Sequence, residues 1–281
     1  MMRRLSSGWV TLTLFSLGFF TFIYLPLIII TVYSFNSNPV NMMVWDGFTL
    51  DWYRGLFGLQ ERVDDLGMNR AIYVESTDQL IAALKNSLTI AFFTTSISTV
   101  IGTATAIALA RYRFRARGFY SGFLLIPMMM PDIVLGIGLL IFFVTIGFQL
   151  SLLTIIIGHC TFLISYVFVV VQARMAGLDP ALEEASADLG ASEWLTLRKV
   201  LLPQLAPGIV GGALLAFVIS MDDLVITYFI AGTGSTTLPL FIFSMVRRGV
   251  KPEINAIATL IILASVVIAA IGLWLRSRKT D

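Results

Sequence analysis

LDPALEEASADLGASEWLTLRKVLLPQLAPG, residues 178–208, is a polar segment between two long apolar runs, at about 152–171 and 208–231. A run of about 20 apolar residues is long enough to cross the hydrocarbon core of a bilayer as a helix. A polar segment between two such runs should protrude into water on one side of the membrane. The segment therefore predicts a fold in which membrane-spanning helices are joined outside the bilayer by a structured connection.

The composition of the whole chain also indicates a membrane protein. Of its 281 residues 57% are hydrophobic and only 13% are charged, and the mean hydropathy is +0.88. Soluble domains usually carry about 25% charged residues. The chain has one cysteine, Cys160, and one histidine, His159, which excludes an intramolecular disulfide and argues against a metal site. We expect an all-α integral membrane protein with a single transmembrane domain and no metal.

Six apolar runs are candidate transmembrane helices. They cover about residues 9–33, 86–110, 119–146, 152–171, 208–231 and 254–275. The first run follows the basic start MMRR and is too long for a signal-peptide core, and no small-residue cleavage pattern follows it, so we expect an uncleaved span. Two longer polar segments separate these runs. The first covers residues 36–85 and is expected to contain a short amphipathic helix near Leu50 to Leu59. The second covers residues 179–206.

The distribution of basic residues predicts the orientation of these spans. The short connection RYRFRAR, residues 111–117, carries four arginines, and a short basic loop resists translocation across the membrane. If this loop and the N-terminus lie on the same, cytoplasmic side, most of the 19 Lys and Arg residues lie on that side too. We expect both termini and segment 179–206 to be cytoplasmic, and segment 36–85 to be extracytoplasmic. A basic run can also bind nucleic acid, but between two spans we expect no nucleic acid.

Segment 178–208 has the signals of two short helices. Asp179 followed by Pro180 forms a good N-cap and first position, and Gly190 can end that helix with a positive φ. Ser192 can cap the second helix. The residues expected to end this second helix are Pro203 and Pro207.

The same segment resembles a family motif. Glu184-Ala185-Ser186, three residues, Gly190, nine residues and Val200-Leu201-Leu202-Pro203 are similar to the EAA motif of ABC-importer permeases, which reads EAA, three residues, Gly, nine residues, Ile, any, Leu, Pro. The chain departs from it only at Ser186 and Val200. The resemblance implies that segment 179–206 is a coupling loop that docks on an ATP-hydrolysing partner. The residues that inherit this coupling role are Glu184, Ala185, Gly190, Leu202 and Pro203.

Further stretches narrow the resemblance. They are GFTLDWY at 47–53, KNSLTIA at 85–91, ARYRFR at 110–115, MMPDIV at 129–134, SMDDLV at 220–225 and KPEINAIATL at 251–260, and all resemble permeases of the spermidine/putrescine importer group. The resemblance implies the type I ABC importer permease fold in a bacterial inner membrane. It also implies a transported polyamine, two copies of an ATPase, a second homologous permease and an extracytoplasmic polyamine-binding protein.

The chain itself lacks the G-x-x-x-x-G-K-[ST] phosphate loop of P-loop ATPases. We therefore expect a non-catalytic subunit with no catalytic residue and no cofactor, surrounded by membrane lipid, with ATP used by the partner.

Acidic residues inside apolar runs are the candidate substrate-path residues. Each would cost about 2.5 to 3.5 kcal/mol at the centre of a spanning helix, so a functional reason is expected. At about 1.5 Å rise per residue, Asp132, Asp222 and Tyr24 all lie roughly 20 to 22 Å above the cytoplasmic ends of their runs. Carboxylates and aromatic rings suit an alkyl polyammonium, through ion pairs and cation–π contacts. A structural role for these carboxylates in holding helices together is the alternative.

FVISMDDLVITYF, residues 217–229, contains two adjacent aspartates, Asp222 and Asp223. On helical spacing, Asp223 shares a stripe with Ser220 and Thr227. Periodicity therefore favours Asp223 as the carboxylate that faces the path, although the resemblance does not settle which of the two does so.

Two other features of the apolar runs carry structural expectations. Pro127 and Pro131 should loosen the helix around Asp132, and a broken helix inside a membrane is tolerated where it faces protein or a water-filled cavity. His159 and Cys160 are expected to form an interhelix contact rather than to take part in chemistry.

Other functions fit the sequence less well. An ion-coupled secondary transporter of organic cations would also use membrane acids, but it would have no ATPase for an EAA-like loop to contact. An ABC permease for a different small ligand would share the same scaffold. An intramembrane aspartyl protease should show G-x-G-D, which precedes neither Asp132 nor Asp222, and a serine protease should show G-x-S-x-G, which is absent.

Overall fold

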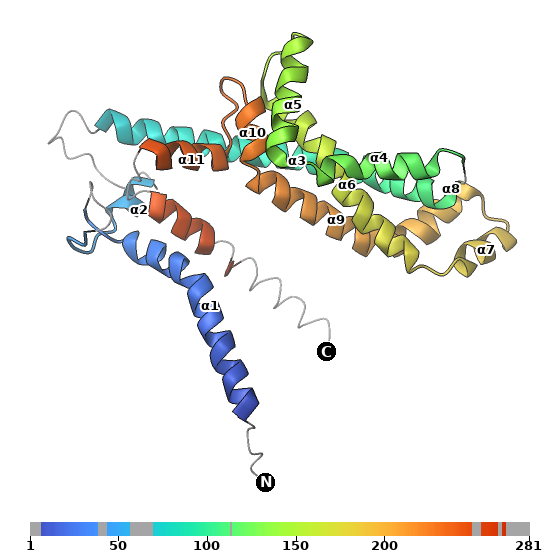
Figure 1. Ribbon diagram of the computed structural model, residues 1–281, viewed down its shortest axis with the longest axis horizontal. Helices are drawn as coiled ribbons and strands as arrows, with labels where there is room; N and C mark the ends of the chain where they lie inside the picture. The colour runs from blue at the N-terminus through green and yellow to red at the C-terminus, as the bar shows by residue number, and fades with distance from the viewer. Residues whose placement is uncertain are drawn as a thin grey trace. The chain divides into compact units, whose positions relative to one another are not determined.

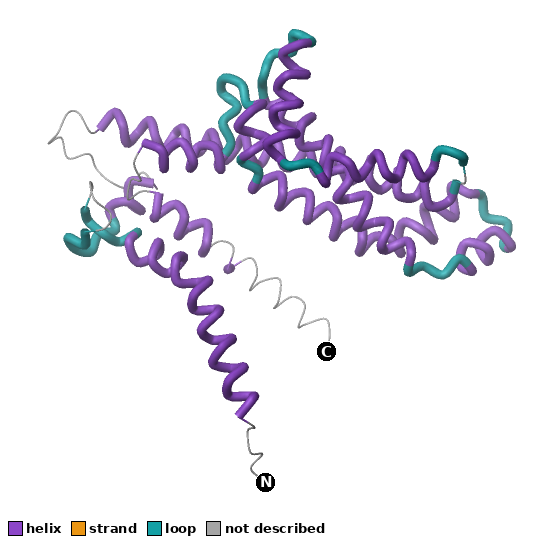
Figure 2. Tube along the Cα trace, in the orientation of Figure 1, coloured by secondary structure: helices purple, strands orange, loops and turns teal. Residues whose placement is uncertain are grey.

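The computed structural model describes residues 7–38, 44–56, 70–112, 114–248, 254–263 and 266–267. These residues are mainly helical (Figure 2), and an isolated antiparallel β-bridge joins Asn36 and Phe48. The chain divides into two compact units, Met1–Arg70 with Ser244–Asp281, and Ala71–Phe243. Each unit is described by itself.

The first unit contains α1 (Ser7–Tyr33) and α2 (Asp51–Leu56). The predicted first span, 9–33, is confirmed as a helix, and its large apolar side chains are exposed on all faces, as expected for contact with lipid. The chain after α1 folds back on itself: the hydroxyls of Ser34 and Tyr53 lie 2.6 Å apart, and the Trp52 indole N–H donates to the Asn36 carbonyl at 2.8 Å. Helix α2 lies within the predicted amphipathic stretch.

The second unit is built around one central helix (Figure 1). Its elements are α3 (Arg70–Arg111), α4 (Arg117–Met129), α5 (Asp132–Thr145), α6 (Leu152–Ala176), α7 (Ala181–Asp188), α8 (Glu193–Thr196), a π turn (Leu197–Leu201), α9 (Leu202–Asp222), α10 (Val225–Ile230) and α11 (Leu238–Arg248), the last of which runs on into the first unit. Helix α6 is the most buried. A Cβ at Gly102 of α3 would lie 2.9 Å from the Ile164 carbonyl oxygen, and one at Gly212 of α9 would lie 3.4 Å from Val167, so both helices approach α6 at glycines.

Four helices of the described residues are long and apolar enough to cross a membrane. They are Trp9–Tyr33, Gln79–Arg111, Leu152–Ala176 and Glu193–Asp222. The pair Arg117–Met129 and Asp132–Thr145, bent by 103°, makes a fifth if it counts as one span. Of the predicted sixth span, 254–275, the structure describes residues 254–263 and 266–267, which include a short apolar helix, Ile254–Leu263; the rest of this prediction lies outside the described residues.

The predicted third run, 119–146, is two helices rather than one. Pro127 lies inside α4 without ending it, and the break falls at Met130 and Pro131. Met130 precedes a proline and is extended, with φ −72° and ψ 141°. Pro131 occupies the N-cap of α5, where its missing N–H is not needed.

Three other helix boundaries differ from the sequence prediction. Pro203 and Pro207 do not end a helix: a π turn joins α8 to α9, with the Leu202 N–H bonded to the Leu197 carbonyl, and Pro203 lies in the first turn of α9, where no donor is required. The predicted fifth run is interrupted between α9 and α10, at Asp223. Helix α3 begins at Arg70, so the second half of the predicted polar segment is helical.

Candidate functional site

The break between α9 and α10 places two neighbouring carboxylates in different environments. Asp223 has an extended backbone, with φ −65° and ψ 121°, which ends α9 at Asp222. Its carboxylate accepts hydrogen bonds from the backbone N–H groups of Ile226 and Thr227, at 3.4 and 2.8 Å, and from the Thr227 hydroxyl at 2.8 Å. Asp223 thus satisfies N–H groups that the first turn of a helix leaves without an intrahelical partner.

His159 of α6 ties both sides of this break together. Its ring is fully buried, with Nδ1 2.9 Å from the Ser220 hydroxyl and Nε2 3.1 Å from both an Asp223 carboxylate oxygen and the Thr227 hydroxyl. We call these four residues the His159 cluster. A buried carboxylate is costly unless it is paired and hydrogen-bonded, and the cluster supplies both. The prediction that His159 forms an interhelix contact is confirmed.

The predicted stripe of Ser220, Asp223 and Thr227 exists, but it packs against α6 inside the fold. Ser220, Asp223 and Thr227 do share one face, and that face contacts α6 of the same chain. The side chain of Asp223 is only 8% exposed, whereas Asp222 is exposed. The preference for Asp223 as the carboxylate that faces the path is therefore not supported by its position, because its hydrogen-bonding capacity is used within the fold.

Asp132 lies at a second helix break near the first one. It is the exposed first residue of α5. One turn further, a Cβ at Gly136 would lie 2.7 Å from the Phe229 ring and 3.4 Å from the Ile226 backbone, so α5 and α10 touch there. Asp132 precedes Gly136 by four residues and Asp222 precedes Ile226 by four. Asp132 is thus about 6 Å along α5 from this helix contact, and Asp222 precedes the same contact by four residues, across the break.

The helix ends give these two carboxylates opposite electrostatic settings. Asp132 is at the N-terminal end of α5, where the partial positive charge of the helix favours an anion. Asp222 is the last residue of α9, beside backbone carbonyls that lack intrahelical partners. Its carboxylate adds to the negative end of that helix, which favours a bound cation.

Helix α10 is held against α6 at its other end as well. The Thr154 hydroxyl of α6 donates to the Ile230 carbonyl at 2.8 Å. A Cβ at Gly158 would lie 2.3 Å from the Ile230 side chain, so only glycine fits there without movement. The short helix is therefore fixed by α6 at both ends.

Tyr24 belongs to the first unit, on α1. It is 54% exposed, and its ring is stacked on Phe20 with the centroids 6.4 Å apart. Its place in the substrate path stays a prediction.

The polar segment folds as its capping residues predict. The Asp179 carboxylate accepts from the Ala181 N–H at 3.0 Å. Gly190 has φ +80°, and the bonds from Gly190 to Ala187 and from Ala191 to Ser186 form a Schellman motif after α7. The last of these signals, the Ser192 hydroxyl, accepts from the Leu195 N–H at 3.4 Å.

The outer face of this segment is open to a partner. Glu184 and Ala185 are exposed on α7. Two large apolar side chains are exposed as well: Leu189, just after α7, at 89%, and Trp194 of α8 at 67%. On the inner side, the hydroxyl of Ser186, where the motif has alanine, lies 2.9 Å from that of Thr196 and joins the two short helices.

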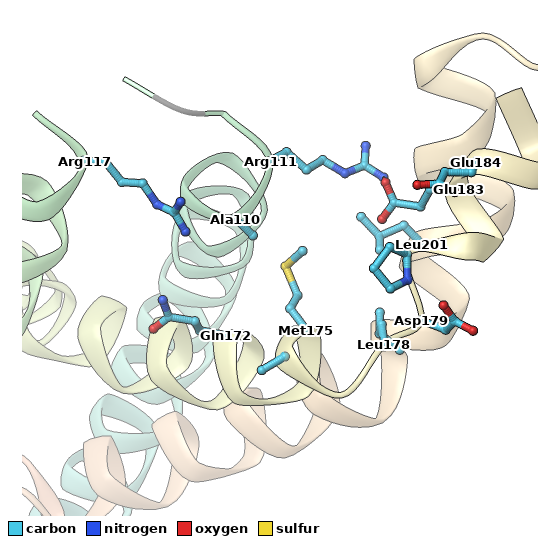
Figure 3. Close-up of a pocket in the computed structure, with 12 residues that line it drawn as sticks. Ala110, Arg111, Arg117, Gln172, Met175, Leu178, Asp179, Glu183, Glu184 and Leu201 are labelled. Atoms are coloured by element: carbon cyan, nitrogen blue, oxygen red, sulfur yellow. The ribbon is translucent and has the colours of Figure 1, made fainter. Parts of the chain in front are cut away.

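A pocket of about 490 Å³ lies between α7 and the ends of α3, α4 and α6 (Figure 3). Arg111, the last residue of α3, extends toward α7 and forms an ion pair with Glu183. This bond joins residues 72 apart in the chain. The sequence placed Arg111 in a basic loop and in a stretch that resembles the importer group, but it did not point to Glu183, because no spacing rule connects two charges so far apart.

Comparison with known proteins places these features in a family. Residues 98–278 match the model of the family described as binding-protein-dependent transport system inner membrane component.

This chain belongs to that family.

Relatives and solved structures agree with this assignment. The permease is 41% identical over 278 residues to the spermidine/putrescine transport system permease protein PotC of Escherichia coli K12, covering 99% of this chain and 96% of that protein. It is 38% identical over 266 residues to the putrescine transport system permease protein PotI of the same strain, covering 92% and 88%. A bacterial ABC transporter that imports the acidic polysaccharide alginate shares its fold, with a TM-score of 0.67, 14% identity, and 99% and 98% coverage.

The family assignment gives the site its setting. The chain is a multi-pass inner membrane permease subunit of an ABC importer, and its relatives are transport permease subunits. The alternative of an ion-coupled secondary transporter is not supported. In this permease, the two broken helices with exposed carboxylates and the capped helix pair of segment 179–206 are the two candidate functional regions.

Proposed function

We propose that this permease translocates polyamines into the cytoplasm. The observation that carries the proposal is the similarity over nearly the whole chain to permeases named for spermidine and putrescine. The two exposed carboxylates beside the α5–α10 contact supply matching chemistry, because an ammonium group that leaves water needs replacement charge and acceptors.

The two carboxylates would act in succession along the path. Asp132 and Asp222 lie at helix breaks, where backbone groups are also free to replace water around the ligand. Asp222 would attract an amine together with the carbonyl end of α9, and Asp132 would pair with another amine of the same molecule. Single carboxylates bind weakly enough for release, so we assign tight selection to the binding protein rather than to this chain.

Energy would enter through segment 179–206. In this proposal both chain termini and this segment are cytoplasmic, and a dimer of a separate ATPase docks on the exposed face around Glu184, Gly190 and Trp194. ATP is used by that partner, and this chain needs no cofactor. A second homologous permease completes the path, and an extracytoplasmic polyamine-binding protein delivers the ligand to segment 36–85.

Uptake of labelled spermidine and putrescine tests the proposal. The complete system is expressed in a strain without its own polyamine importers, with this subunit as wild type, Asp132→Asn, Asp222→Asn or the control Thr145→Val, at matched membrane levels. Thr145 is the exposed last residue of α5, at the opposite end of that helix from Asp132. We expect ATP-dependent uptake by the wild type and the control, and a loss of about tenfold or more in each path variant. No polyamine uptake by the wild type would refute the substrate and favour a different small ligand, whereas unchanged uptake in both path variants would make these carboxylates structural.

A further inference from the structure

The His159 cluster is a buried polar contact that the proposed path does not use directly. His159 is 0% exposed, and both ring nitrogens have partners from α9, α10 or the residue between them. Either protonation state fits this arrangement: Nε2–H donates toward Asp223, and Nδ1 accepts from or donates to the Ser220 hydroxyl. The ring therefore links three helical elements at the point where the adjacent aspartates diverge.

We propose that His159 is a positioning residue for the path: by holding Asp223 inward at the α9–α10 break, it leaves Asp222 as the one carboxylate of the pair that meets the transported cation. This inference rests on the proposed function. It divides the roles of the two aspartates, since Asp223 caps α10 and pairs with His159, and Asp222 stays exposed.

The geometry shows what His159 adds to the break. No proline or glycine lies between Ser220 and Thr227, so the chain there lacks the residues that most often break a helix. Asp223 is held by its cap bonds to the first turn of α10 and by one bond to His159 of α6, and only the bond to His159 ties its carboxylate to the neighbouring helix. Without the imidazole, the Asp223 carboxylate keeps its bonds to the first turn of α10 but loses its buried partner, which is strongly unfavourable for a charge.

Two consequences follow from losing that partner. Asp223 can turn outward and add a second negative charge beside Asp222, or α9 can continue through the break, so that Asp222 no longer lies at a helix end. Both change what a cation meets at position 222.

Thiol accessibility at position 222 tests the inference. In a Cys160→Ser background, Asp222→Cys is the single thiol of this chain. The complex is purified with its co-expressed partner subunits, in which cysteines are replaced, and is placed in lipid nanodiscs. The labelling rate with a cationic methanethiosulfonate is then compared among His159, His159→Gln and His159→Leu. Gln can still donate toward Asp223, and Leu cannot. We expect labelling to change about tenfold in His159→Leu, the effect of losing a hydrogen bond to a charged group, and to stay near the starting rate in His159→Gln.

Thr154→Val is the matched control. It removes the other hydrogen bond between α6 and α10 without touching Asp223, so general loosening of that contact would change labelling in this variant too. Equal labelling in all His159 variants, or an equal change in Thr154→Val and His159→Leu, would overturn the inference. If His159→Leu does not assemble, His159→Asn, whose amide is too short to reach Asp223, takes its place.

Uptake separates this inference from the function on which it rests. With Asp222 restored, the same His159 variants are assayed for spermidine and putrescine uptake, and we expect the ratio of the two rates to shift in His159→Leu and to be rescued in His159→Gln. A His159-dependent labelling pattern in a complex that imports no polyamine would support the positioning role and refute the polyamine assignment alone.

Discussion

Breaking the ion pair between Arg111 and Glu183 should reduce the coupling of ATP hydrolysis to transport. The pair ties the end of α3 to α7, which lies on the segment proposed to contact the ATPase. Along the chain, the two helices are separated by α4, α5 and α6. The two side chains are 23% and 35% exposed, so we expect the pair to stabilise this arrangement by an amount between two limits. An exposed surface ion pair contributes about 0 to 1 kcal/mol, and a fully buried hydrogen bond to a charged group contributes up to about 3 kcal/mol. About 1 kcal/mol is a reasonable value, and it corresponds to a factor of about five in the population of the tied arrangement.

The assay is the number of ATP molecules hydrolysed per polyamine imported by the reconstituted complex. We expect Glu183→Gln to raise this ratio about fivefold, and Arg111→Glu to raise it further, because it adds repulsion with the acidic groups of the pocket, Asp179, Glu183 and Glu184. The exchanged pair, Arg111→Glu with Glu183→Arg, should recover most of the coupling. Thr145→Val, at the end of α5 and outside the coupling segment, should leave the ratio unchanged. An exchanged pair no better than Arg111→Glu alone would refute the reasoning.

Two glycine substitutions test the packing and the turn that shape the two regions. Gly158→Ala should lower the thermal unfolding midpoint of the purified complex, because its Cβ would meet the Ile230 side chain at 2.3 Å and overpacking costs about 1 to 3 kcal/mol. Gly138→Ala, with nothing within 4 Å, should leave the midpoint nearly unchanged, and equal shifts would contradict the packing argument. Gly190→Ala should weaken binding of the ATPase, measured by titration, because a left-handed residue, here at φ +80°, costs about 1 to 2 kcal/mol with a side chain. Undiminished ATPase binding would show that the turn after α7 does not need this geometry.

Local signals in the sequence were enough to predict much of the helical architecture. The membrane character and the runs that became α1 and α6 follow from apolar length alone, since a helix satisfies its own backbone in lipid. The caps at Asp179, Gly190 and Ser192 were also predictable, because each cap bonds within about four residues of itself.

Sequence alone thus determined that this protein is a set of membrane helices with a capped helix pair between two of them. Only the tertiary structure decided that Asp223 turns inward, that Asp222 stays exposed and that Arg111 binds Glu183. The physical reason is distance along the chain: the buried carboxylate of Asp223 is bonded to His159, 64 residues away, and the ion pair spans 72 residues. Such contacts depend on which helix faces which, and helical periodicity reveals that a face is shared without naming the partner that covers it.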